Sequence, residues 1–134
     1  MKLTEKQIEN SILAYLLITP GCLIYKHNNT GVYDPNKETF RKVVNKFIPS
    51  GASDLYGSFW SRATFIEVKT PDEYSYIASH YEELKKYVGK DKKKSRYRDQ
   101  ILFLEDQKKA GCIAFFADSI QRVKDELSKV EVSR

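Results

Sequence analysis

Two acids and a lysine stand at positions where a pair of neighbouring strands could bring them together. Glu67 and Lys69 are separated by one residue in the run Phe-Ile-Glu-Val-Lys, and Asp54 precedes both of them. Side chains alternate along a strand, so Glu67 and Lys69 share one face while Ile66 and Val68 point to the other, into the core. If Asp54 begins the preceding strand of a hairpin, its carboxylate comes alongside Glu67. Two carboxylates and one ammonium group then share a small patch.

Such a patch has the ligands that a hard divalent cation prefers. Mg²⁺ binds a few protein oxygens and keeps several waters, and Asp54, Glu67 and the main-chain carbonyl of Val68 could supply that set. The metal would polarise a phosphoryl oxygen and lower the pKa of a bound water. Lys69 could orient or help deprotonate that water and offset charge on the phosphate. An acid-x-Lys pattern is also common on exposed strands that face solvent, and the residues alone leave both interpretations open.

The elements expected before and around these residues begin with a helix over 5–18. It is predicted by a capping box of Thr4 and Gln7 and by apolar residues at helical spacing. The segments that follow are a strand at 22–26, a turn at 28–31, a short strand at 32–34, a weaker strand signal at 42–48, a loop at 49–53, and a hairpin of strands 54–60 and 62–70.

The second half of the chain is predicted to be mainly helical. The Cys112–Phe116 run is continuously apolar, which is typical of a central strand covered on both faces. Together the segments predict one domain over 1–134, with a mixed sheet flanked by helices. The other expected segments are a helix at 71–88, a lysine-rich connector at 89–95, a helix at 96–110 ended by Gly111, and a last helix at 120–129.

One short segment carries the excess positive charge of the chain. The whole chain has a formal charge of +5, and the segment from Lys85 to Arg98 contains eight basic residues and one acid, so it alone carries +7. This segment suits a polyanion, because each neutralised phosphate releases counterions. A solvated loop is the alternative. The basic residues are Lys85, Lys86, Lys90, Lys92, Lys93, Lys94, Arg96 and Arg98.

Composition excludes several classes of protein. The chain has 134 residues, of which 41% are apolar and 31% charged, as in an ordinary globular domain. No segment approaches the roughly 20 apolar residues of a membrane helix, and no targeting signal is recognisable, so we expect a cytoplasmic protein without a membrane partner. Its two cysteines and two histidines lack the spacing of a zinc site.

The order of several short motifs resembles a known nuclease family. Those motifs are Glu5, Asn28-Asn29-x-Gly31, Gly51-x-Ser53-Asp54, Glu67-Val68-Lys69, Gln100 and Gly111. In this order they resemble the VRR-NUC (virus-type replication-repair nuclease) domain of the PD-(D/E)XK superfamily, over nearly the whole chain. The resemblance implies a restriction-endonuclease-like mixed sheet with an αβββαβ core. Residues 71–95 depart from many relatives, because a helical, lysine-rich insert stands there in place of a short loop.

The resemblance also implies roles for individual residues. Asp54 and Glu67 would ligate Mg²⁺ or Mn²⁺, Lys69 would complete the catalytic motif, and Gln100 would hydrogen-bond near the motif or the scissile phosphate. A glutamate of the first helix commonly joins such a site. Glu5 and Glu9 are both candidates, and both could instead be ordinary exposed acids near a helix start.

A further set of residues is expected at the DNA. The positively charged members come from the insert and the helix after it, while Asn28 and Asn29 could equally shape a left-handed turn. The expected DNA-binding residues are Asn28, Asn29, Ser53, Lys90, Lys92, Lys93, Lys94, Arg96 and Arg98.

The sequence therefore predicts a metal-dependent DNA endonuclease that hydrolyses phosphodiester bonds. Stand-alone members of the family resemble junction-resolving enzymes. Because a two-fold dimer places two sites symmetrically, we expect a homodimer that acts on branched DNA such as a Holliday junction. A flap or single-strand nuclease, a restriction-like enzyme, a catalytically inactive DNA-binding module of the same fold and a basic scaffold protein are the alternatives.

Overall fold

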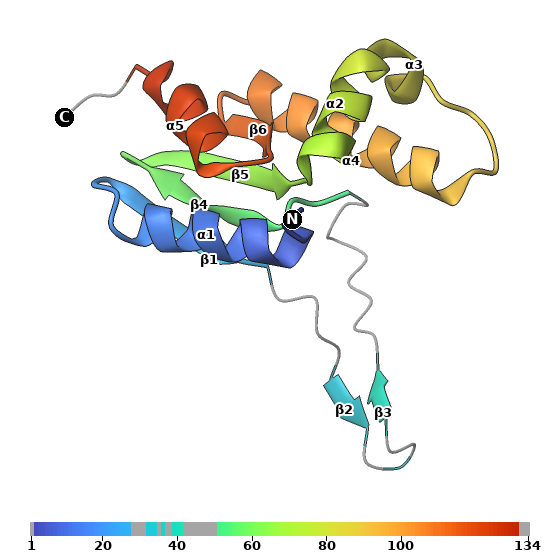
Figure 1. Ribbon diagram of the computed structural model, residues 1–134, viewed down its shortest axis with the longest axis horizontal. Helices are drawn as coiled ribbons and strands as arrows, with labels where there is room; N and C mark the ends of the chain where they lie inside the picture. Colours follow the sequence, from blue (N-terminus) through green and yellow to red (C-terminus); the bar gives the residue numbers. More distant parts are fainter. Residues whose placement is uncertain (1, 28–31, 35, 37–38, 42–50, 132–134) are drawn as a thin grey trace.

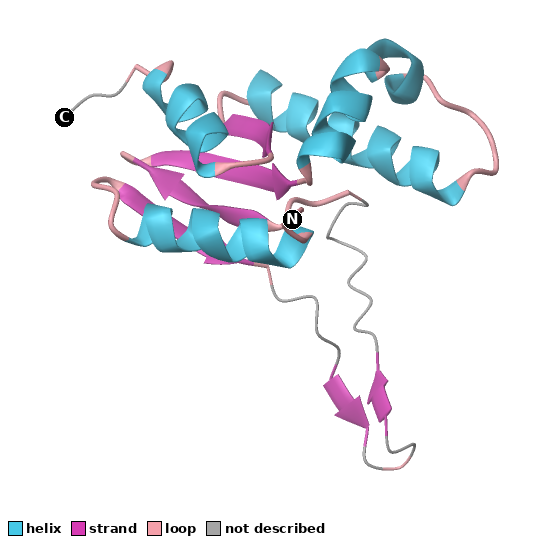
Figure 2. Cartoon of the chain, in the orientation of Figure 1, coloured by secondary structure: helices cyan, strands magenta, loops and turns pink. Residues whose placement is uncertain are grey.

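The computed structural model describes residues 2–27, 32–34, 36, 39–41 and 51–131 (Figure 1). It is an α/β structure in which helices flank an open, four-stranded mixed sheet (Figure 2). The elements in chain order are α1 (Glu5–Leu17), β1 (Cys22–Lys26), β2 (Val32–Asp34), β3 (Thr39–Arg41), β4 (Leu55–Phe59), β5 (Arg62–Val68), α2 (Pro71–Ser79), α3 (Tyr81–Lys85), α4 (Lys92–Lys109), β6 (Ile113–Ala117) and α5 (Ile120–Ser128).

The main sheet has the strand order β1-β4-β5-β6. Strands β1, β4 and β5 pair antiparallel, and β6 pairs parallel with β5. The β4–β5 hairpin turns through Trp60 and Ser61, both at positive φ, as a two-residue loop requires. Its register pairs Leu55 with Ile66, which sets Asp54 opposite Glu67 one step beyond the last ladder pair. Strands β2 and β3 form a separate two-stranded sheet.

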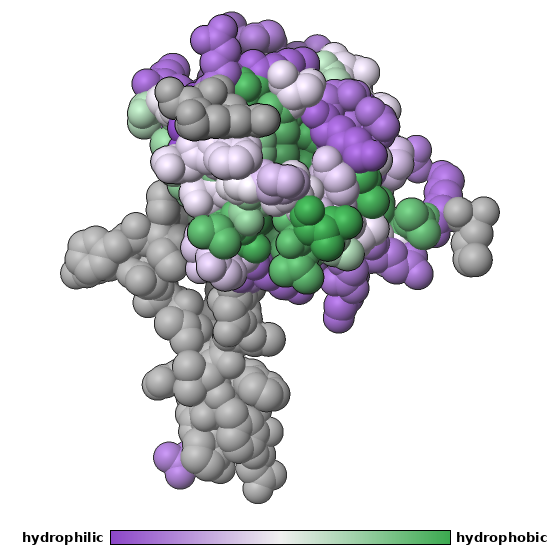
Figure 3. Space-filling model, turned by 90° about the vertical axis from the view of Figure 1, so that its left-hand side faces the viewer, coloured by the Kyte–Doolittle hydropathy of each residue, from purple (hydrophilic) through white to green (hydrophobic). Residues whose placement is uncertain are grey.

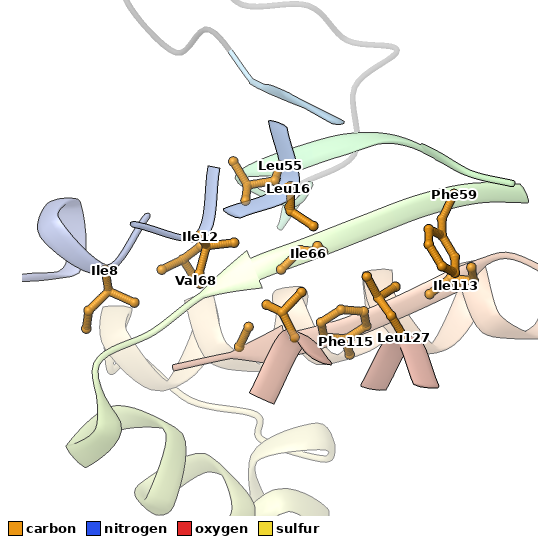
Figure 4. Close-up of a cluster of buried hydrophobic side chains, with 12 residues drawn as sticks. Ile8, Ile12, Leu16, Leu55, Phe59, Ile66, Val68, Ile113, Phe115 and Leu127 are labelled. Carbon is orange, nitrogen blue, oxygen red and sulfur yellow. The ribbon is translucent and has the colours of Figure 1, made fainter. Parts of the chain in front are cut away.

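Helices cover both faces of the main sheet. On one face, α1 and α5 pack their apolar residues over β5, where Ile66 and Val68 are fully buried (Figure 4). On the other face, α4 packs Phe103 and Leu104 against Phe65 and Ala114. Burial of these faces supplies the apolar area that holds the domain together. The start of β4 and the end of β5 lie near the start of α1 and near α2 and α4 (Figure 1).

The structure confirms most of the expected elements. The capping box predicted for the first helix is present, because the Thr4 hydroxyl accepts from the Gln7 N–H and the Gln7 side chain accepts from the Thr4 N–H. The strands at 22–26 and 32–34 and the hairpin are also present. The turn expected at 28–31 and the strand expected at 42–48 lie outside the described residues.

The helix expected over 71–88 is wrong in its extent. It is broken at His80, which ends α2 and precedes the short helix α3. The His80 N–H still donates to the Tyr76 carbonyl, but its ψ of 23° leaves the helical range. Val88, the last residue of the expected helix, lies beyond α3 and is 92% exposed.

The lysine-rich connector expected at 89–95 is also wrong, because α4 begins at Lys92. Asp91 caps this helix: its carboxylate accepts the main-chain N–H groups of Lys93 and Lys94 at 2.9 and 3.0 Å. An aspartate at the N-cap outweighs the poor preference of lysines for a helix start. The lysine cluster is therefore held on a helix.

The expectation that the apolar run near Cys112 forms a central strand is wrong as well. Strand β6 lies at the edge of the described sheet and pairs with β5 alone. It is apolar because α5 covers one of its faces and α4 the other, with Phe115 and Ala114 in the two different clusters. Burial on both faces does not distinguish an edge strand from a central one.

Some apolar side chains remain on the surface. Leu17 and Ile18, at the end of α1, are 85% and 80% exposed, and Leu23 in β1 is 63% exposed. Figure 3 views the molecule from the side where the turn between α1 and β1 lies, and apolar side chains gather there. No helix in the described part of the chain has the length and apolar character to cross a bilayer.

Candidate functional site

The end of the β4–β5 hairpin brings Asp54 and Glu67 together. The main-chain N–H of Asp54 donates to Glu67 Oε2 at 3.2 Å, and the main-chain N–H of Val68 donates to Asp54 Oδ2 at 3.0 Å. Each carboxylate thus accepts a main-chain N–H from the segment that carries the other acid. This arrangement confirms the predicted position of Asp54 alongside Glu67.

Glu67 and Lys69 are buried, so they do not decorate a solvated strand. They are 3% and 2% exposed, and Lys69 Nζ lies 3.8 Å from Glu67 Oε1. The same Glu67 oxygen accepts from Gln100 Nε2 of α4 at 3.0 Å. Four predicted residues therefore meet at one point: Asp54 just before β4, Glu67 in β5, Lys69 just after β5, and Gln100 in α4.

The electrostatics of the site favour a bound cation. Burial, followed by the neighbouring Asp54 carboxylate, raises the pKa of Glu67 well above its ordinary value, and Lys69 opposes this rise. Two carboxylates that share a small, buried volume disfavour ionisation of each other. A divalent cation between them relieves that repulsion, as a neighbouring positive charge does for any carboxylate.

The donor atoms also fit a hard cation. Gln100 Oε1 is buried and has no hydrogen-bond partner within the described residues, although its own amide nitrogen is bound to Glu67. The N–H of Val68 points at Asp54, and in an extended strand the carbonyl of the same residue lies on the same side. Carboxylate, carbonyl and amide oxygens are the ligands that Mg²⁺ takes alongside water.

The carboxylate content of the site is low. Within residues 2–27 and 51–131 and the short described segments between them, no three His, Cys, Asp or Glu side chains form a group that could hold a metal ion. A metal ion bound at this point would depend on the Asp54 and Glu67 pair, because no third carboxylate, imidazole or thiol joins them within the described residues.

The loop before Asp54 is fixed by a close approach to α4. Gly51 has φ +84°, and a Cβ built there would lie 2.5 Å from the Asp99 carbonyl oxygen and 2.7 Å from the Gln100 nitrogen. Ser53 is 3% exposed and its hydroxyl donates to the Leu55 carbonyl, so it shapes the start of β4. The Gly-x-Ser-Asp motif thus packs the Asp54 loop against the helix that carries Gln100.

The two glutamates of α1 have different surroundings. Glu9 is 8% exposed, and its carboxylate pairs with Lys26 Nζ at 3.1 Å. Partial burial raises the pKa of Glu5, Lys69 opposes the rise, and Asp54 adds to it. Glu5 therefore lies within the field of the site, whereas Glu9 is engaged by β1.

Two residues beside Lys69 were not expected. The Tyr97 hydroxyl donates to Glu73 Oε2 at 2.7 Å, and the Tyr97 ring lies under Lys69, with Nζ 5.0 Å from the ring centroid. Although burial acts to raise it, the pKa of Glu73 is lowered overall, by the Tyr97 hydroxyl, Lys69 and Thr70. Thr70-Pro71-Asp72-Glu73 is a capping-box sequence directly after Lys69, and that signal could have identified Glu73.

The expected DNA-binding residues divide into three groups. Ser53 and Arg98, expected at the DNA, are instead used internally. The buried Ser53 hydroxyl donates to the Leu55 carbonyl, and Arg98 donates to the Tyr87 carbonyl and to Asp99. Asn28 and Asn29 lie outside the described residues. The remaining basic residues are exposed. Lys90 precedes α4, and the other four lie in its first two turns: Lys92, Lys93, Lys94 and Arg96.

Comparisons of the chain with models of known protein families, with curated proteins and with solved structures find no match.

Replacing Gly51 with alanine should destabilise the fold by roughly 2–4 kcal/mol, since both its positive φ and the α4 backbone exclude a side chain. Gly111→Ala is the matched control, because Gly111 has φ +91° but nothing within 4 Å of an added Cβ. It should cost only about 1–2 kcal/mol. Urea unfolding measures both, and equal losses would contradict the close approach.

Mn²⁺ or Mg²⁺ should stabilise the protein by binding the native acid pair. We expect saturating metal to raise Tm by roughly 5 °C. Asp54→Asn keeps an acceptor for the Val68 N–H but removes the charge, and should abolish the rise. Asp125→Asn makes the same change at an exposed acid of α5 and should leave it intact. A rise that persists in Asp54→Asn would place the metal elsewhere.

Proposed function

We propose that the protein is a Mg²⁺- or Mn²⁺-dependent DNA endonuclease that hydrolyses phosphodiester bonds. The observation that carries this proposal is the meeting of the half-buried Asp54 with the buried Glu67, Lys69 and Gln100. The Asp54 carboxylate accepts the Val68 N–H, and the Glu67 carboxylate accepts the Asp54 N–H and the Gln100 amide. Burying an acid and a lysine costs free energy, and such perturbed electrostatics are typical of sites that do chemistry.

The order of elements supports the nuclease fold. In the main domain the chain runs α1, β1, β4, β5, α4 and β6, with β5 and β6 parallel. This is the αβββαβ order implied by the resemblance to VRR-NUC domains, with α2 and α3 inserted after β5 (Figure 1). We propose a restriction-endonuclease-like domain on this basis.

The residues of the chain have distinct tasks in this reaction. Asp54, Glu67 and the Val68 carbonyl would hold the metal, which supplies Lewis-acid polarisation of the phosphoryl oxygen and acidifies a water. Lys69, held by Glu67 and the Tyr97 ring, offsets negative charge as it builds on the phosphate. Gln100 fixes the orientation of the Glu67 carboxylate.

The substrate is proposed to be branched DNA bound through its backbone. The exposed lysines in the first turn of α4 lie on the same helix as Gln100, so phosphate contacts and the cutting site share a rigid element. Phosphate contacts position a duplex without reading its sequence. A homodimer would set two such sites in symmetric positions on a Holliday junction.

Cleavage of a panel of labelled DNAs tests the function. With Mg²⁺, a four-way junction should be cut in preference to linear duplex of the same sequence. Asp54→Asn, Glu67→Gln and Lys69→Met should each reduce the rate by about 100-fold or more, because each removes charge that acts at the scissile phosphate. Asp125→Asn should keep the wild-type rate.

The other candidate functions give different patterns in that panel. Preferred cutting of a 5′ or 3′ flap, of single strands or of linear duplex would replace the junction substrate but keep the site. Binding without cutting under every metal would indicate an inactive DNA-binding module, and equal rates in wild type and all three variants would remove the site assignment.

The dimer has its own test. Sedimentation at micromolar concentration should give twice the 15.6 kDa chain mass, because a single domain of this size covers little of a four-way junction. A monomer that stays monomeric when junction DNA is added would contradict symmetric resolution.

A further inference from the structure

A cavity of about 340 Å³ lies between α2 and the first turns of α4, next to the candidate catalytic lysine. Tyr97 forms part of its wall, and the ring of this tyrosine also contacts Lys69 Nζ. The cavity is therefore connected to the acid pair through the Tyr97 ring and Lys69, which pairs with Glu67. It is lined by Asp72, Glu73, Tyr76, Asp91, Lys93, Lys94 and Tyr97.

The three carboxylates of this wall are already engaged. Asp72 pairs with Lys2 at 2.8 Å, and Glu73 accepts the Tyr97 hydroxyl. Asp91 accepts two main-chain N–H groups as the cap of α4. Each carboxylate therefore has a donor of its own within the protein.

In the part of the chain that the structure describes, the two ammonium groups form no ion pair, although Lys93 lies close enough to Glu73 to help lower the pKa of that carboxyl. Within the described residues neither Lys93 nor Lys94 has a carboxylate within salt-bridge distance, and both side chains lie near tyrosine rings, 5.8 Å from Tyr97 and 5.6 Å from Tyr87. Both stand in the first turn of α4, where the helix dipole disfavours cations and favours an anion. Asp91 already caps the helix, so an anionic group in the cavity would pair with the two lysine side chains.

An aromatic surface completes the cavity. Tyr76 is 37% exposed, and its ring stacks on the His80 ring with 4.5 Å between the ring centroids. This stacking restricts the orientation of the Tyr76 ring. The Tyr97 ring lies 6.1 Å away at a tilt. Aromatic faces beside cations are the usual means of holding a base and its phosphate together.

We infer that this cavity binds one unpaired nucleotide of the DNA strand, with its phosphate on Lys93 and Lys94 and its base against Tyr76. The inference rests on the proposed nuclease function and adds a substrate feature to it. A base that is already unpaired enters such a pocket without the cost of unstacking a duplex. The cavity therefore favours branch points that carry a free nucleotide over fully paired ones.

The test compares two branched DNAs that differ only at the branch point. One carries a single unpaired 2-aminopurine there and the other is fully paired, and both are titrated in EDTA so that no strand is cut. The wild-type protein should bind the unpaired form at least fivefold more tightly, with a change in 2-aminopurine fluorescence.

Matched variants locate the effect in the cavity. Lys93→Gln with Lys94→Gln removes two charges that line the cavity, and Lys90→Gln with Lys92→Gln removes two from the same segment that do not. Both pairs should weaken binding of either DNA, but only the first should abolish the preference for the unpaired form. Tyr76→Ala should also abolish it, whereas Tyr74→Ala, on the same helix but facing Arg122, should not.

The outcomes separate this inference from the nuclease function. An absent preference in the wild type, or an equal loss in both lysine pairs, overturns the nucleotide site, and metal-dependent cleavage of the paired DNA in a parallel assay then leaves the nuclease function standing. If the wild type neither binds nor cuts either DNA, both proposals fail.

Discussion

The structure depends on one buried acid, Glu67, which lies beside the half-buried Asp54 at the end of the β4–β5 hairpin. Glu67 alternates with Ile66 and Val68, which anchor β5 in the core, so the strand cannot release its acid to solvent without exposing its apolar face. Such a carboxylate is tolerated only where donors and cations surround it. Gln100, Lys69 and the Asp54 backbone supply these groups. The geometry of the site therefore depends on how α4 and the hairpin pack together.

The centre of the site could be predicted from sequence because its geometry is local. Strand alternation places Glu67 with Lys69, and a short hairpin places Asp54 opposite, without knowledge of the rest of the fold. The difference between Glu5 and Glu9 could not be predicted, since it depends on how α1 is rotated on the sheet and on Lys26 from another strand. The need for a glycine at position 51 likewise arises from contact with a helix far along the chain.

The errors in the fold have a common cause. Apolar residues indicate burial, and the strand near Ile113 is indeed buried on both faces. The same residues do not indicate whether that strand lies at the centre or at the edge of the sheet. Periodicity also ran past the helix break at His80. The polar composition of the lysine run predicts a loop, although a single N-cap, Asp91, is enough to begin α4 there.

The segment after Lys69, which we propose to be an insert in the nuclease fold, contacts the candidate site directly. Thr70 follows Lys69 directly and caps α2, so the insert begins at the candidate catalytic lysine, and Glu73 then binds Tyr97 on α4. This bond ties the insert to the helix that bears both Gln100 and the lysine cluster. A phosphate backbone is repelled by an acid pair alone, and the cationic first turn of α4 beside it lowers that repulsion. In the proposed nuclease, acids that hold a metal and lysines that contact DNA would require each other, and the Glu73–Tyr97 bond joins α2 to the helix that bears those lysines.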